Sequence, residues 1–290
     1  MRIVLRRPKT PAIAAAVLCL AAGTVASSQV VRAGGPAVES TAPADPSIPA
    51  IVPTDRLSVD WWAARHKAIV AELPKHADAQ LLLLGDTVIN NYEKAEPPDQ
   101  NFQPIWQQYY APRKALNLGF SGDTTANVLW RLDHGEVAGL NPKLAVVLIG
   151  SNNTAVGQSA EETEAGIDAV VKDIEHRLPG TKILLVGILP SNLPSREQNF
   201  DVNGYLGQHY AGGEDAKVSY IDISIVFYPH GELDMSLFYD PSLTPPGLAT
   251  HPNTRGQRLM ASALEPAVAR LMGDTRVKPM EIPTRTVATR

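Results

Sequence analysis

Leu81-Leu82-Leu83-Leu84-Gly85-Asp86-Thr87-Val88 decides the fold, because a short apolar run ends abruptly in Gly-Asp-Thr. The leucines predict a strand buried on both faces, which is typical of a parallel sheet. Gly85 permits a sharp turn, and Asp86 and Thr87 follow at the carboxyl end of the strand, where open α/β sheets bind ligands. Thr87 is therefore either the N-cap of a following helix or a nucleophile that needs a neighbouring base.

Strand and helix patterns alternate along the rest of the chain. Further buried strands are expected at 115–118, 144–149, 182–187 and 218–223. Helical spacing of apolar residues is found over 61–73, 123–134, 160–178, 198–210 and 254–272. The prolines of residues 93–104 predict a loop, followed by a short helix over 106–110. The alternation predicts an α/β fold: a three-layer α/β/α sandwich with a five-stranded parallel sheet and right-handed crossovers.

The N-terminus has the pattern of a secretory signal. A basic start and an apolar stretch over 13–26 precede small residues that suit a signal peptidase. We therefore expect a signal peptide over 1–33 and a periplasmic or secreted protein, with an uncleaved membrane anchor as the alternative. Residues 34–54 predict a flexible linker, 55–273 a single domain and 274–290 a disordered tail.

Composition excludes several classes of function. Cys19 is the sole cysteine and lies inside the predicted signal, so the mature chain would have no disulfide. Residues 34–290 carry 21 basic and 30 acidic residues, a net charge of −9 that argues against nucleic acid. The sequence has no phosphate-binding loop, no dinucleotide fingerprint and no His-x-x-x-His pair, so we expect neither cofactor nor metal. Stable membrane insertion after signal cleavage is not expected, and the oligomeric state is not predicted.

Polar groups follow four separate segments of the predicted sheet. These are Asp86-Thr87, Ser121-Gly122, Asn152 and His251. The carboxyl ends of parallel strands meet at one edge, so a hydroxyl, a backbone N–H, an amide and an imidazole would converge there. Together they could carry out acyl transfer. Each has a structural alternative: a turn glycine, a loop-capping amide, or a surface histidine before a proline.

The chain resembles the SGNH (GDSL) hydrolases over roughly residues 58–272. The resemblance rests on four blocks in the family's order: Gly85-Asp86-Thr87, Gly122, Gly150-Ser151-Asn152-Asn153 and His251-Pro252-Asn253. Residues 115–132 are most similar to the catalytic subunits of brain-type platelet-activating-factor acetylhydrolase within that family. The resemblance implies the flavodoxin-like fold of these hydrolases and an esterase activity.

The resemblance also assigns roles by position. Thr87 stands at the nucleophile position, which is normally serine, and His251 at that of the general base. Gly122 and Asn152 stand at the two oxyanion-hole positions. The family places an aspartate three residues before the histidine, where this chain has Leu248. We hypothesise that Asp240 replaces it, because its local context matches the family's block as if eight residues had been inserted before the histidine.

Two functions follow from this pattern. The first is an exported esterase or acyltransferase that acts on acyl esters, with O-acyl groups of an exopolysaccharide such as cellulose as candidate substrates. The second is a catalytically impaired relative that binds an acylated sugar as an accessory protein in polysaccharide biosynthesis or export. The β-methyl of Thr87, which restricts χ1, and the leucine at 248 motivate the second function.

Overall fold

The computed structural model describes residues 47–212, 216–244 and 247–278 of the chain. The predicted signal peptide and residues 34–46 of the predicted linker lie outside the described residues, as does the tail from residue 279. No helix of the described segments is both long enough and apolar enough to cross a membrane.

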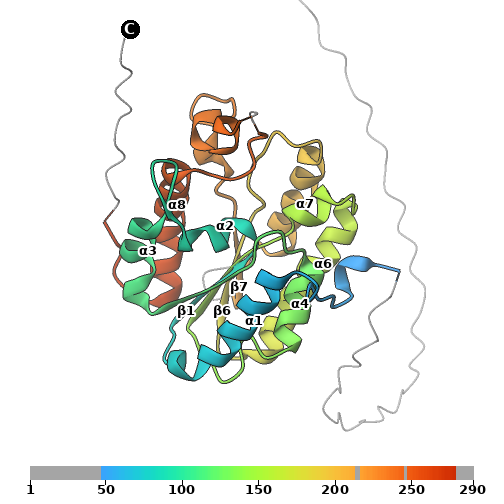
Figure 1. The fold of residues 1–290 in the computed structure, drawn as a ribbon, viewed down its shortest axis with the longest axis vertical. Helices are drawn as coiled ribbons and strands as arrows, with labels where there is room; N and C mark the ends of the chain where they lie inside the picture. The colour runs from blue at the N-terminus through green and yellow to red at the C-terminus, as the bar shows by residue number, and fades with distance from the viewer. Residues whose placement is uncertain (1–46, 213–215, 245–246, 279–290) are drawn as a thin grey trace, which may run out of the picture. The chain divides into compact units, whose positions relative to one another are not determined.

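Five parallel strands form the central sheet, as predicted (Figure 1). Their order is β4-β1-β5-β6-β7. The bounds are β1 Leu81–Gly85, β4 Ala115–Gly119, β5 Leu144–Leu148, β6 Lys182–Val186 and β7 Val218–Ile221. The chain runs from β1 to β4 on one side and then to β5 on the other. β1 therefore ends where the strand order reverses, which is where open α/β sheets place their binding crevice.

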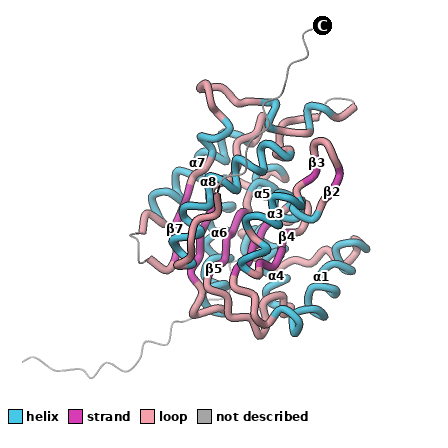
Figure 2. The backbone as a smooth tube through the Cα atoms, turned by 90° about the vertical axis from the view of Figure 1, so that its left-hand side faces the viewer, coloured by secondary structure: helices cyan, strands magenta, loops and turns pink. Residues whose placement is uncertain are grey.

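Helices cover both faces of this sheet, which confirms the predicted three layers (Figures 1 and 2). Successive side chains of β1 point to opposite faces of the sheet, which divides the core into two clusters. Leu81 and Leu83 belong to the first cluster, and Leu82 and Leu84 belong to the second. The first cluster packs under α2 (Thr87–Asn90), α3 (Gln103–Tyr109) and α8 (Thr254–Met272). The second packs under α4 (Thr125–Asp133), α6 (Ala160–Arg177) and α7 (Arg196–His209).

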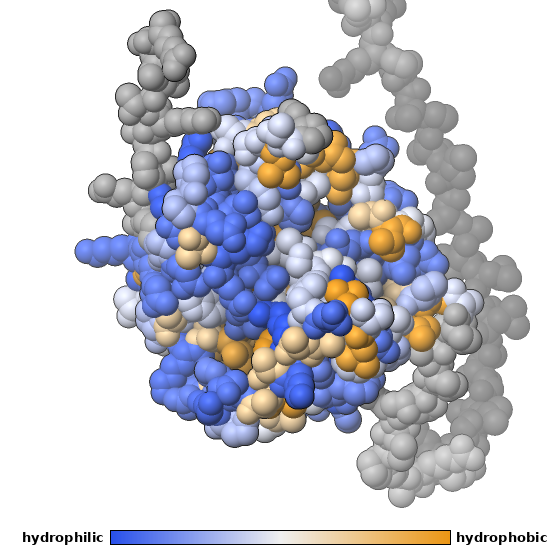
Figure 3. Space-filling model, in the orientation of Figure 1, coloured by the Kyte–Doolittle hydropathy of each residue, from blue (hydrophilic) through white to orange (hydrophobic). Residues whose placement is uncertain are grey.

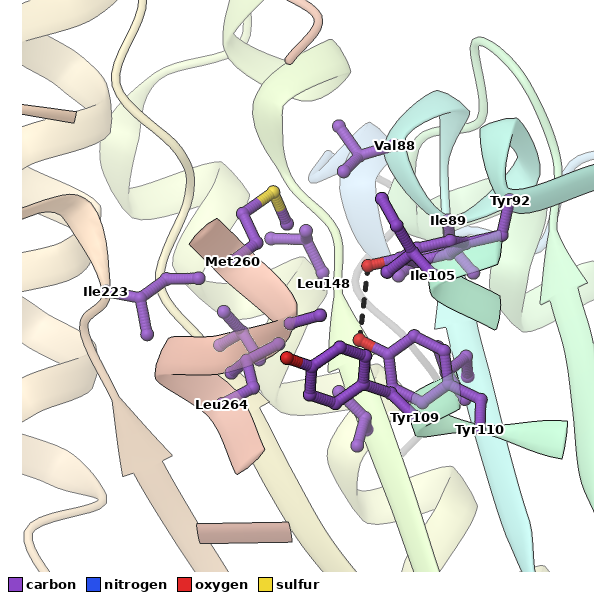
Figure 4. Close-up of a cluster of buried hydrophobic side chains, with 14 of the residues drawn as sticks. Val88, Ile89, Tyr92, Ile105, Tyr109, Tyr110, Leu148, Ile223, Met260 and Leu264 are labelled. Carbon is purple, nitrogen blue, oxygen red and sulfur yellow. Dashed lines mark hydrogen bonds between the residues drawn. The ribbon is translucent and has the colours of Figure 1, made fainter. Parts of the chain in front are cut away.

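In the core beneath α3 and α8, Tyr92, Tyr109 and Tyr110 lie among aliphatic side chains (Figure 4). Tyr92 and Tyr110 are buried, and their hydroxyl groups hydrogen-bond to each other at 3.1 Å. Tyr109 reaches the hydroxyl of Ser262 at 2.9 Å. Each phenol thus keeps a polar partner while its ring fills apolar space, which avoids the penalty for an unpaired buried hydroxyl.

The predicted linker is wrong for residues 47–54, which pack on the domain. Ala50 is fully buried in a short 3-10 helix, Pro49–Ile51, and its carbonyl accepts a hydrogen bond from Thr125 Oγ1 at 2.8 Å. Gly166 in α6 permits this contact, since a Cβ there would lie 2.9 Å from the Ala50 Cβ. The chain then leads into α1 (Asp60–Glu72). Packing on a glycine gives no periodic signal, so the sequence pattern did not indicate it.

Two other boundaries also differ from the prediction. Residues 274–278 of the predicted disordered tail contact the domain, because Asp274 pairs with Arg113 at 2.8 Å and the Val277 amide donates to Glu265. The expected loop over 93–104 contains a two-stranded hairpin, β2 (Ala95–Glu96) and β3 (Gln100–Asn101). Its prolines occupy the turn and the first turn of α3, positions that need no backbone donor.

A buried ionic network lies under the end of β4. Arg131 in α4 is fully buried and pairs with Asp123 at 2.9 Å and with Glu136. Asp123 also accepts a hydrogen bond from the indole of Trp62 at 2.7 Å. Burial raises the pKa of Asp123, and the positive charge of Arg131 counteracts that shift. The carboxylate next to Gly122 is therefore held from several directions.

Replacing Arg131 with leucine should destabilise the protein by about 3–5 kcal/mol, because two buried carboxylates would lose their counter-charge. Chemical denaturation followed by circular dichroism would measure the change. Arg177→Leu is the matched control: Arg177 pairs with Asp173 and Asp133 at the surface, where a loss of at most about 1 kcal/mol is expected. Equal losses for the two variants would contradict the structural role of the buried network.

Candidate active site

The carboxyl end of β1 places Asp86 under the site and Thr87 at its surface. Asp86 is buried and caps α2, since its Oδ1 accepts the Val88 amide at 3.1 Å. Its Oδ2 accepts the Ser151 hydroxyl at 2.8 Å. Burial raises the pKa of Asp86, whereas these two hydrogen bonds act to lower it. Because Asp86 is the N-cap of α2, the hydroxyl of Thr87 is not needed to cap that helix.

The Thr87 hydroxyl faces the loop that follows β4. The Gly122 amide donates to Thr87 Oγ1 at 3.0 Å, and Ser121 Oγ lies 3.1 Å from the same oxygen. Gly122 has a φ of +80°, a conformation that side chains disfavour. The predicted oxyanion N–H therefore points at the predicted nucleophile, in a turn that requires glycine.

Asn152 lies in the first turn of α5 (Ser151–Ala155), directly after β5. Its Nδ2 group donates to the carbonyl of Asp123 at 2.8 Å and lies 3.4 Å from Asp86 Oδ2. These contacts draw the amide across the end of β1 toward the loop after β4. The two predicted oxyanion donors are thus joined through Asp123, whose backbone follows Gly122.

Asp240 contacts His251, as hypothesised from the sequence. Asp240 Oδ1 lies 2.8 Å from His251 Nδ1, and Oδ2 accepts the backbone amides of Thr250 and His251 at 3.1 and 2.5 Å. Leu248, at the family's aspartate position, is 51% exposed. Burial opposes ionisation of Asp240, but the hydrogen bonds from His251 and Thr250 outweigh it and lower the pKa of the carboxyl group.

Backbone contacts bring Asp240 and His251 together although ten residues lie between them in the chain. Phe238 and Pro252 form an antiparallel bridge, and the Tyr239 amide donates to the His251 carbonyl at 3.2 Å. The segment between them is looped out, and the Gly247 amide closes back on the Asp240 carbonyl at 2.7 Å. The extra residues therefore leave the two ends of the loop side by side.

A cavity of about 140 Å³ is lined by three of the predicted residues, Thr87, Asn152 and His251, whereas Gly122 and Asp240 lie outside its lining. A hydroxyl, an amide and an imidazole thus face one hollow. Apolar and polar side chains share the rest of the lining: Val88, Leu148, Ile149, Ala155, Ile188, Leu189 and Leu193, and Asp86, Ser151, Ser191, Asn199 and Thr250. Among the described residues, no three His, Cys, Asp or Glu side chains are grouped so that they could hold a metal ion.

Sequence reasoning missed three residues that contact this site. Ser121 was noted only as the neighbour of Gly122, and Ser151 as part of a block, although both hydroxyls hydrogen-bond there. Arg56 donates to the Ser121 carbonyl at 2.8 Å and to Asp123 at 3.0 Å. Arg56 comes just after the predicted linker, where the sequence pattern indicates no contact with the sheet.

Residues 83–259 match the model of the GDSL-like lipase/acylhydrolase family, which covers more than half of the chain. The chain belongs to this family. This GDSL-family protein is 36% identical over 166 residues to the human platelet-activating factor acetylhydrolase IB subunit alpha2, covering 55% of this chain and 68% of the relative. It is 34% identical over 154 residues to the human subunit alpha1, covering 52% and 62%.

Solved structures share the fold of this GDSL-family protein at lower identity. The crystal structure of a protein from Bacteroides fragilis that is described as an acylhydrolase aligns with a TM-score of 0.57 at 16% identity. The alignment covers 76% of this chain and 99% of that protein. A GDSL-like lipase from Bacteroides thetaiotaomicron aligns with a TM-score of 0.50 at 17% identity, covering 72% and 96%. At these identities the alignments establish the architecture alone.

Asp240→Asn should lower the stability of this GDSL-family protein at pH 7 by about 1.5–3 kcal/mol, the range for hydrogen bonds to a charged group. The lowered pKa means that the stabilisation is complete above the carboxyl's ordinary value of 3.8 and disappears as the pH falls through the folded value. Urea unfolding between pH 7 and pH 2 would measure the free energy of unfolding of the wild type and of Asp240→Asn. The difference between the two free energies should shrink only at the acidic end of this range. A difference that is constant with pH would refute the charged interaction.

Proposed function

We propose that this protein is an exported esterase that hydrolyses short acyl esters by a Thr87-His251-Asp240 triad. The observation that carries the proposal is the shared cavity, with Thr87 and His251 on its wall and Asp240 hydrogen-bonded to Nδ1 of His251. Membership of an acylhydrolase family supports the reaction class. The basic and apolar N-terminal sequence supports export to the periplasm or beyond.

The proposed reaction has two halves. Thr87 Oγ1 attacks the ester carbonyl carbon while His251 Nε2 accepts the hydroxyl proton. The backbone amide of Gly122, which donates a hydrogen bond to Thr87 in the structure, and the side-chain amide of Asn152 stabilise the negative oxygen that forms. The C–O bond to the alcohol then breaks, and the alcohol leaves with the proton from His251. Water next attacks the acyl-threonine by the same base, which releases the acid and restores Thr87.

Asp240 has a positioning role in this scheme. Its hydrogen bond to Nδ1 leaves Nε2 as the ring nitrogen that accepts the hydroxyl proton, and the carboxylate stabilises the imidazolium that forms. Loss of the equivalent carboxylate in comparable triads lowers kcat by about 10⁴-fold. The exposed Leu248 has no part in the scheme.

The substrate proposal rests on cavity size and on export. A hollow of about 140 Å³ with partly apolar walls fits a short acyl group such as acetyl. The O-acyl groups of an exopolysaccharide such as cellulose are esters of that size that an exported enzyme could reach. We therefore place the O-acylated polysaccharide first among candidate substrates.

A second function is favoured by Thr87 itself. Its β-methyl restricts χ1, and its oxygen is already engaged by Gly122 and Ser121. A site of this kind could retain an acylated sugar and turn it over slowly, as an accessory protein in polysaccharide biosynthesis or export would. The leucine at position 248 no longer supports this second function, because Asp240 contacts His251 in place of the family's aspartate.

Thr87→Ala and His251→Ala should each lower kcat/KM for p-nitrophenyl acetate by about 10³-fold or more, since each removes a member of a unit that acts together. Initial rates at pH 7.5 would measure the loss. Thr275→Ala and His209→Ala are matched controls outside the cavity lining and should retain the wild-type rate. The esterase proposal fails if neither site variant lowers the rate.

Thr87→Ser separates an impaired site from one built for threonine. We expect kcat to rise about 10- to 100-fold, because removal of the methyl frees χ1 and relieves crowding at the attacking oxygen. Burst-phase and steady-state kinetics with p-nitrophenyl acetate would report the change. An unchanged or lower kcat would mean that the cavity is adapted to the threonine methyl.

A further inference from the structure

An arginine and an exposed tryptophan lie on the other side of Thr87 from the acyl cavity. The cavity is lined from the ends of β5 and β6, whereas Arg56 contacts Ser121 and Asp123 after β4. The sheet order β4-β1-β5-β6 puts these two regions on opposite sides of β1, which carries Thr87. The two substituents of an ester carbonyl diverge, so one can enter the cavity while the other runs over β4.

The Arg56 guanidinium covers Gly122. A Cβ built on Gly122 would lie 3.3 Å from Arg56 Nη1, 3.4 Å from Nη2 and 3.7 Å from Cζ. The same guanidinium lies 5.8 Å from the centre of the Trp61 ring. Gly122, Arg56 and Trp61 therefore form a continuous path that leads outward from the proposed oxyanion site.

Both side chains have capacity for a ligand. Trp61 is 43% exposed, at the start of α1. Arg56 is 26% exposed and bonds Ser121 and Asp123 through Nη1 alone. Within the described segments, Nη2 and Nε of Arg56 have no hydrogen-bond partner, so a bound molecule could accept from them.

The local charge favours a neutral ligand. Arg56 and Arg131 are balanced by Asp123 and Glu136 in the same network. The guanidinium therefore offers directed N–H donors without an uncompensated positive charge to attract an anion. An exposed indole beside such donors suits a molecule with apolar C–H faces and hydroxyl edges, which is the chemistry of a sugar ring.

In the view of Figure 3, exposed hydrophobic residues occur in separate patches among hydrophilic ones. Leu57 and Trp61 are 50% and 43% exposed, and both come after the packed residues 47–54. Thr54 fixes that segment, because its amide donates to the Ala126 carbonyl at 3.0 Å and its carbonyl accepts from Asn127 at 2.8 Å. Residues 47–56, which we call the strap, are thus anchored on the domain, and they position Arg56.

We propose that Arg56 and Trp61 form a subsite for the alcohol part of the substrate, and that this alcohol is a sugar unit. The inference rests on the proposed esterase function and adds its specificity. The short acyl group fills the cavity, while the saccharide lies on the β4 side against the indole, with its hydroxyls on Nη2 and Nε of Arg56.

Paired substrates test the subsite. Trp61→Ala and Arg56→Lys should each lower the ratio of kcat/KM for acetylated cello-oligosaccharide to kcat/KM for vinyl acetate by about tenfold, mainly through KM. Lysine keeps a charge beside Asp123 but loses the planar donors. Phe200→Ala is the control, since Arg196 lies 5.5 Å over Phe200 on α7, away from β4, and it should leave the ratio unchanged.

A binding measurement separates this inference from the proposed function. In the Thr87→Ala background, acetylated cello-oligosaccharide should quench tryptophan fluorescence with an affinity that Arg56→Lys lowers about tenfold. Failure of the wild type to hydrolyse either ester would end the esterase proposal, while the titration still tests the subsite. Hydrolysis with a ratio that both variants leave within twofold, a ratio lowered by Phe200→Ala instead, or a preference for acetylated lysophospholipid would overturn the subsite.

Discussion

The close approach of β1 to β5 is the constraint on which the site depends. A Cβ on Gly85 would lie 2.1 Å from the Leu148 carbonyl oxygen, so only glycine lets the strand end so close to its neighbour. This contact fixes where the backbone leaves the sheet. Asp86 then turns inward to cap α2, and Thr87 turns outward to the cavity.

Asp123 connects the two groups that are proposed to bind the oxyanion. Its carboxylate is held by Arg56, Arg131 and Trp62, and its carbonyl accepts the Asn152 amide. Because Gly122 precedes it, the same residue orients both donors. Donors fixed in advance need little reorganisation when charge develops, which is the main source of oxyanion stabilisation. The buried ion pairs therefore serve the geometry of the site, and they also tie the strap at residues 47–56 to it.

The sequence predicted the sheet and the helix layers because both leave periodic signals. Runs such as Leu144–Leu148 are apolar throughout when both faces are buried, and α6 and α8 repeat apolar residues at helical spacing. The packing of Ala50 against Gly166 leaves no such signal, since one small residue fills one gap. Ser121 and Arg56 were missed for a similar reason: their contacts join segments far apart in the chain. Asp240 was found because its local context survived the longer loop.

That loop shows how a reactive pair can keep its geometry while its spacing along the chain drifts. The bridge between Phe238 and Pro252 aligns the chain at both ends of the loop, so Asp240 lies beside His251 although ten residues come between them. The interval between an acid and its histidine can therefore differ when a backbone bridge holds the two ends together. Sequence searches that require a fixed interval between acid and imidazole would miss such chains, whereas a search for the bridge would retain them.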